Sequence, residues 1–98
     1  MTHRIIVRPE AEDDLYAAFD WYESQRPGLG RDFAREISHC IDTIAESPFL
    51  YAPIVGTVRR DLARKFPFGV YYLDNEDEAV VLVVLHCARD PETWKGRK

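Results

Sequence analysis

The spacing of apolar residues predicts a strand followed by a helix at the start of the chain. His3 to Pro9 is a short run rich in β-branched residues, closed by the proline, which is typical of a strand. Pro9 also suits the first turn of a helix, and the acidic residues after it favour the positive end of the helix dipole. One face of this helix is apolar at three- and four-residue spacing, with Ala11, Leu15, Ala18, Phe19 and Tyr22 on it and Trp21 at its edge.

A second helix follows a short break. Pro27 cannot continue a helix and the neighbouring glycines permit a sharp turn, so the first helix ends within Arg26–Gly30. A helical pattern restarts near Leu29 to Asp32 and ends at Ser47–Pro48. Two helices joined this way predict an antiparallel hairpin with apolar faces that must be covered. The apolar positions of the second helix are Leu29, Phe33, Ile37, Cys40, Ile41 and Ile44.

The remainder of the chain predicts the strands that cover this hairpin. Thr57–Ala63 is a short candidate strand, Phe66–Asp74 is a stronger one, and a polar turn at Asn75–Glu78 leads into Ala79–Cys87. The last run is almost wholly apolar, which indicates a central strand. The order β-αα-βββ predicts an α+β domain in which a helical hairpin packs on a small, mainly antiparallel sheet. In Phe66–Tyr72 one alternating set faces the helices, made of Phe66, Phe68, Val70 and Tyr72.

Composition is that of one folded domain. A chain of 98 residues buries a single core, so we expect one domain over residues 1–98. The apolar share of 46% against 31% charged residues excludes a disordered chain. The longest apolar run, Ala79 to Leu85, is too short for a membrane helix, and the N-terminus lacks the apolar region of a signal peptide. We therefore expect a soluble cytoplasmic protein without membrane contact.

The two cysteines predict buried thiols and not a metal or disulfide site. Cys40 and Cys87 lie in apolar surroundings, and a small secreted scaffold would carry a denser cysteine framework. Each follows a histidine, His39 and His86, but the close ligand spacing of a structural zinc site is missing. We expect no metal and no cofactor.

Charge is distributed unevenly. The formal net charge is −4, which makes generic attraction to nucleic acid weak. The first fifty residues hold ten acids against five bases, whereas residues 51–98 hold seven acids against eight bases. In an acidic chain a local concentration of cations indicates a partner-facing surface, although a purely solvated face is the alternative. The cluster consists of Arg59, Arg60, Arg64 and Lys65.

A second candidate lies where the apolar strand ends. His86 could act as a general base and Arg89 could stabilise a phosphate, as cleavage of RNA by its 2′-hydroxyl requires. The alternative is that both are ordinary residues of a strand end, with Arg89 paired to a nearby acid. Phosphate-binding loops, nucleophile elbows and paired catalytic carboxylates are missing from the sequence.

Several segments in this order resemble one known family. RPEAEDDLYAAFDWYESQRPGLG and RRDLARKFPFGVYYLDNEDEAVVLVVLHCARDPETW, residues 8–30 and 59–94, are similar to the ParE/RelE superfamily of type II toxin–antitoxin toxins. The ParE-like branch, which includes plasmid stabilisation proteins, is the most similar. The specific pieces are the basic-Phe-Pro-Phe-x-Val-Tyr-Tyr strand, the segment Val84–Pro91 with its H-x-x-R-x-P pattern, and Trp94 shortly after.

The resemblance implies a toxin held inactive by a cognate antitoxin. RelE-like members cut mRNA in the ribosomal A site, whereas ParE-like members poison DNA gyrase without being nucleases. This chain has Gly69 near the position where RelE-like nucleases place a cation, and a net negative charge. It therefore lacks the electrostatic clamp for A-site phosphates. These departures favour gyrase inhibition, with a ribosome-dependent mRNA interferase or a toxin fold that has lost toxicity as alternatives.

These interpretations assign residues to roles. We expect no catalytic residues; under the nuclease alternative they are His86 and Arg89. We expect antitoxin contact at Tyr16 and Trp21, on the margins of the first helix's apolar face. Direct nucleic-acid binding by the toxin alone is not expected. The residues expected to contact the target are Arg59, Arg60, Arg64, Lys65 and Arg89.

Overall fold

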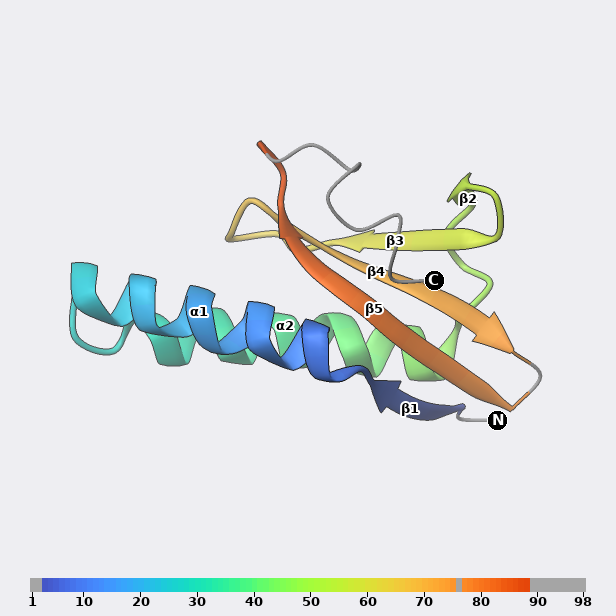
Figure 1. The fold of residues 1–98 in the computed structure, drawn as a ribbon, viewed down its shortest axis with the longest axis horizontal. Coiled ribbons are helices and arrows are strands. Elements are labelled where there is room, and N and C mark those ends of the chain that lie inside the picture. The colour runs from blue at the N-terminus through green and yellow to red at the C-terminus, as the bar shows by residue number, and fades with distance from the viewer. Residues whose placement is uncertain (1–2, 76, 89–98) are drawn as a thin grey trace.

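Two helices lie side by side against one face of a five-stranded sheet (Figure 1). The computed structural model describes residues 3–75 and 77–88. The helices form the predicted hairpin and the α+β class is confirmed. In chain order the elements are β1 (Arg4–Val7), α1 (Pro9–Gln25), α2 (Leu29–Glu46), β2 (Pro53–Val55), β3 (Val58–Leu62), β4 (Phe68–Asn75) and β5 (Glu78–His86).

The sheet is mainly antiparallel, as predicted. Its spatial order is β1-β5-β4-β3-β2, in which β1 pairs parallel with β5 and every other pair is antiparallel. The apolar strand β5 therefore lies between two neighbours. The pattern did not predict β2, because three residues beginning with a proline carry almost no strand signal. This strand exists through its hairpin pairing with β3 across Gly56, where φ is 55°.

β5 is apolar almost throughout because a core covers each of its faces, and a β-bulge divides its residues between the two cores. Tyr71 pairs with Val83 and Tyr72 pairs with Val81, so Leu82 is an additional residue on β5. Beyond this point the alternation of side chains changes phase. Val81 and Val84 pack in the core beneath the helices, whereas Leu82 and Val83 belong to the core on the opposite face.

The core beneath the helices is centred on aromatic rings from both layers. Tyr22 and Phe33 of the helices meet Phe66 and Phe68 at ring-centroid distances of 4.9–6.1 Å. Edge-on contacts of this kind stabilise a pair by about 0.5–1.5 kcal/mol beyond the area that they bury. The predicted inward set of Phe66–Tyr72 is thereby confirmed.

The turn between the helices is closed by one carboxylate. Glu23 accepts hydrogen bonds from the backbone N–H groups of Gly28 at 2.9 Å and Gly30 at 3.0 Å. Gly28 has φ of 90°, which a glycine adopts without steric cost. A methyl group at Gly30 would lie 2.8 Å from the carbonyl oxygen of Phe19, so the close approach of the two helices requires glycine there.

The expectation of two buried thiols is wrong for one of them. Both cysteines are free and Cys40 is buried on α2, but Cys87 is exposed. The apolar strand ends at His86, and Cys87 lies in the turn beyond it, outside the core. None of the helices in the described part of the chain is both long and apolar enough to span a membrane.

Candidate functional site

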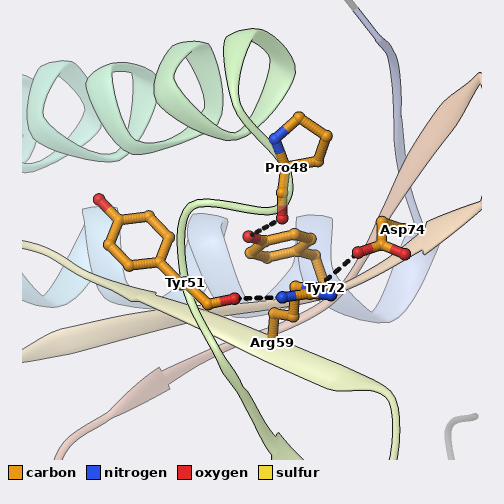
Figure 2. A network of polar contacts seen from close by, with 5 residues as sticks. All are labelled: Pro48, Tyr51, Arg59, Tyr72 and Asp74. Carbon is orange, nitrogen blue, oxygen red and sulfur yellow. Dashed lines mark hydrogen bonds and ion pairs between the residues drawn. The ribbon is translucent and has the colours of Figure 1, made fainter.

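The four cations of the predicted cluster lie on β3 and on the loop between β3 and β4, but their side chains have different environments. Arg59 is directed into the fold. Its Nε donates to Asp74 Oδ2 at 2.5 Å and its Nη1 donates to the Tyr51 carbonyl oxygen at 2.5 Å, with only 17% of the side chain exposed (Figure 2). Arg59 therefore joins the loop after α2 to the sheet.

Tyr72 holds the same loop through a second hydrogen bond. Its hydroxyl donates to the carbonyl oxygen of Pro48 at 2.7 Å (Figure 2), and burial raises the pKa of Tyr72 to about 12. The hydroxyl remains protonated and keeps its role as donor at every physiological pH. Tyr72 and Arg59 thus supply donors to two carbonyl groups of this loop.

Arg60 lies on the face of the sheet away from the helices. Its guanidinium group is over the Tyr71 ring, 6.0 Å from the ring centroid. Its stem covers Gly69 on the adjacent strand, because a methyl group at Gly69 would lie 3.1 Å from Arg60 Cδ. A longer side chain at position 69 would have to displace Arg60. The glycine therefore allows a cation from β3 to lie over β4.

Arg64 and Lys65 are presented to solvent by a carboxylate of α2. Glu36 Oε1 accepts the backbone N–H groups of Arg64 at 3.0 Å and Lys65 at 3.3 Å. The hydrogen bond from Arg64 is the main reason why the pKa of Glu36 is lowered. Because the backbone of the loop is tied to the helix, the two side chains extend outward, and both residues are exposed.

A groove of about 800 Å³ runs between α2 and β3, and we call it the α2–β3 groove. Its floor contains Asp61, only 5% exposed, which accepts hydrogen bonds from the Tyr51 hydroxyl and the Cys40 thiol. Burial raises the pKa of Asp61, and burial first, then the proximity of Asp61, raises the pKa of Cys40 to about 12. Cys40 is thus a neutral hydrogen-bond donor and not a nucleophile.

A second groove, of about 730 Å³, lies between α1 and the end of β5, and we call it the α1–β5 groove. Trp21, which is 59% exposed, lines it, and Tyr16 on the same helix is 65% exposed. Trp21 thus lies where the apolar face of α1 meets solvent, whereas Tyr16 is exposed on the same helix and does not line the groove. Large exposed aromatics beside an apolar groove are typical of a protein-binding surface.

His86 also lines the α1–β5 groove. Its Nδ1 accepts the backbone N–H of Ala88 at 3.0 Å, and its ring contacts Phe68 edge-on at 5.2 Å between centroids. A neutral imidazole with Nδ1 as acceptor carries its proton on Nε2. Nε2 then donates a proton and does not accept one, and no carboxylate of the described chain forms an ion pair with His86. Arg89, its predicted partner, lies outside the described residues.

Within the two described ranges, no three His, Cys, Asp or Glu side chains are placed to hold a metal ion.

The polar residues of these sites that the sequence pattern did not single out are Asp61, Glu36 and Asp14. Only Asp61 could have been identified from the sequence, because it is a charged residue at an inward-facing position of a strand.

Comparison with known proteins identifies the family of the chain. Residues 5–91 match the family model described as ParE toxin of type II toxin-antitoxin system, parDE. Two proteins named Toxin ParE2, from two strains of Mycobacterium tuberculosis, are each 28% identical over 92 residues, which cover 93% of this chain and 88% of theirs.

The fold is shared with a solved structure described as the chromosomal ParDE TA system from P. aeruginosa. The match has a TM-score of 0.77 at 18% identity, and it covers 87% of this chain and 96% of that chain. This likeness is one of fold, and the family model extends it to the sequence over most of the chain. The chain belongs to the ParE toxin family of type II toxin–antitoxin systems, and this membership implies an antitoxin partner.

Proposed function

We propose that the protein inhibits DNA gyrase by binding it as a protein ligand, and that a cognate antitoxin neutralises it. The hydrogen bond that His86 Nδ1 accepts is the observation that favours gyrase inhibition over RNA cleavage. With Nδ1 engaged by Ala88, the imidazole has no free acceptor nitrogen for activating a 2′-hydroxyl, which RNA cleavage requires. The net charge of −4 also weakens the case for binding ribosomal RNA.

The surface for the target is formed by Arg60, Arg64 and Lys65. Arg64 and Lys65 extend from a loop fixed by Glu36, and Arg60 lies flat over Gly69 and Tyr71. Cations held on a rigid scaffold favour an acidic protein surface through charge complementarity. The interactions of Arg59 within the fold account for that residue, and Arg89 remains a proposed contact outside the described part.

A supercoiling assay with purified gyrase tests the target. We expect inhibition at micromolar protein, weakened about tenfold or more by the combined changes Arg64→Glu and Lys65→Glu. Arg31→Glu, an exposed cation of α2 outside the groove, is the matched control and should change inhibition little. A wild-type protein that leaves supercoiling unaffected would contradict the gyrase target.

A different assay tests the alternative activity, ribosome-dependent cleavage of mRNA. Toeprinting of translating ribosomes should show no new A-site cuts in the presence of the wild-type protein. Cuts that disappear in His86→Ala would replace gyrase inhibition with mRNA cleavage. Unimpaired growth of bacteria that express the protein alone would instead indicate a toxin fold that has lost its toxicity.

The surface for the antitoxin is formed by Trp21 and the α1–β5 groove beside it, with Tyr16 as a further exposed aromatic residue of the same helix. An amphipathic antitoxin segment that covers Trp21 would bury one of the residue types that dominate binding energy at interfaces. Trp21→Ala should weaken binding of the cognate antitoxin by about 2 kcal/mol. Asp20→Ala, at an exposed position of the same helix, should have little effect.

A further inference from the structure

The outer edge of β3 is only partly covered. β2 pairs with Val58 and Arg59 and goes no further, whereas β3 continues to Leu62. The N–H of Ala63 donates to the carbonyl oxygen of Phe68 on β4 at 2.8 Å. In an antiparallel pair the backbone groups of successive residues point alternately toward and away from the partner. The N–H and C=O of Leu62 therefore point away from β4, toward the side that β2 does not reach.

The α2–β3 groove lies beside this edge and has an excess of uncommitted positive charge. Arg26, Arg64 and Lys65 line it, and none of them has a carboxylate of the described chain within salt-bridge distance.

The carboxylates of the groove are already engaged. Asp32 lies 3.9 Å from Arg35, Glu36 accepts the two backbone N–H groups of the loop, and Asp61 is buried beneath Tyr51 and Cys40. Glu36 keeps its negative charge, but the four cations of the lining, Arg26, Arg35, Arg64 and Lys65, outnumber its three carboxylates. The groove therefore has a small excess of positive charge and favours an anionic occupant.

The helix side of this edge suits an extended segment. A new strand would meet Arg64 and Lys65 there, whereas on the opposite face the Arg60 side chain lies over Gly69 and Tyr71 of β4, away from the edge. Leu62 is 49% exposed and Leu50, at the groove, is 63% exposed, so apolar contacts are available between the charged ones. Strand addition draws its affinity from backbone hydrogen bonds and its specificity from alternating side chains.

We propose that the edge of β3 at Leu62 and the α2–β3 groove bind an extended acidic segment of the target protein, which adds to the sheet as a short sixth strand. This inference rests on the proposed function for the identity of the partner. It goes further by naming the backbone edge and the kind of segment that the edge accepts. Charge complementarity with Arg64 and Lys65 is the reason for an acidic segment.

A pair of variants at one position tests the backbone contact. Leu62→Pro removes the outward N–H, and Leu62→Ala keeps it while removing the same side chain. The fold should tolerate the proline because this N–H has no partner on β4 and prolines occur on edge strands. In the supercoiling assay Leu62→Pro should inhibit gyrase at least about fivefold more weakly than Leu62→Ala. Equal inhibition by two variants with the same thermal midpoint would overturn the inference while leaving gyrase as the target.

A measurement on the wild-type protein keeps the inference testable if the proline variant fails to fold. A ten-residue peptide of alternating threonine and glutamate is added to the isotope-labelled protein, and hydrogen exchange of the Leu62 amide is followed by NMR. We expect protection of this amide, and none with the matched threonine–lysine peptide. Protection by both peptides, or by neither, would overturn the inference. This result does not depend on gyrase, so a wild-type protein that fails to inhibit gyrase would contradict only the proposed function.

Discussion

The Asp14 carboxylate accepts the backbone N–H of Val84 at 3.1 Å, and so joins the second turn of α1 to the edge of β5. The contact lies just beyond the end of β1, whose pairing with β5 stops at Val7 and Val81. The acidic residues at the start of α1 have a shared explanation in the helix dipole. Asp14 has an additional role, because it satisfies a strand N–H that has passed the end of the neighbouring strand.

Asp14→Ala should lower the free energy of unfolding by about 1–3 kcal/mol, because it leaves the N–H of Val84 in a partly buried position without this acceptor. Urea denaturation followed by circular dichroism measures the change. Asp13→Ala, in the same turn but exposed, is the control and should shift stability by less than about 0.5 kcal/mol. Equal effects of the two variants would assign the contribution of Asp14 to the helix dipole alone.

Arg59 is predicted to act on stability and only secondarily on binding. Arg59→Leu removes donors to Asp74 and to the Tyr51 carbonyl oxygen, and it leaves a carboxylate whose side chain is 18% exposed. We expect a loss of about 1–3 kcal/mol in the free energy of unfolding. Arg64→Leu, at an exposed loop position, should change the same quantity by less than about 0.5 kcal/mol. If the two variants have equal stability, the network in Figure 2 does not hold the loop.

The two cysteines should differ in reactivity. At pH 8 a thiol with a pKa of about 12, as burial gives Cys40, is thiolate in only about one molecule in 10,000. Cys87 is exposed in the turn after β5. Iodoacetamide should therefore add once to the native protein and twice to the unfolded protein, as read by mass spectrometry. Cys87→Ser should abolish the native adduct, and an adduct that persists in this variant would show that Cys40 is accessible.

Glu36 should make stability depend on pH in one direction. The hydrogen bond from the Arg64 N–H lowers the pKa of Glu36 in the folded state. This carboxylate therefore stabilises the fold at pH values above 4.5, the pKa of glutamate in the unfolded chain. The contribution is lost as the pH falls through the folded pKa. Unfolding curves between pH 3 and pH 7 should show wild type above Glu36→Gln at neutral pH, and the difference should shrink below about pH 4.5.

A control variant and a contrary result complete the test of Glu36→Gln. Asp20→Asn, at an exposed position in the middle of α1, should remain parallel to wild type over this range. A difference between wild type and Glu36→Gln that stays constant with pH would mean that packing of the side chain, and not its charge, holds the loop of Arg64 and Lys65.

Periodicity predicted the helices and the main strands well, because their signals are local. The stripes of α1 and α2 repeat every three or four residues, and Pro27 and Pro48 end the helices through their own geometry. The inward set of β4 follows from simple alternation. In contrast, β2 depends on pairing with β3, so three residues with a proline were not recognised as a strand.

The candidate site was predictable in composition but not in geometry. The sequence by itself determined that cations gather in residues 59–65, that Trp21 lies at the edge of a helical face, and that Gly69 interrupts an aromatic strand. Each of these follows from residue identity and spacing.

Only the tertiary structure decided what these residues contact. Arg59 is directed inward because Asp74, fifteen positions later, lies beside it, while Arg60 lies over Gly69 across the strand pair. Glu36 fixes the loop of Arg64 from another element. Polar contacts between residues distant in sequence leave no periodic signal, because one hydrogen bond constrains two positions and nothing between them. The fold's layers could therefore be read from the chain, whereas the division of its cations between stability and binding could not.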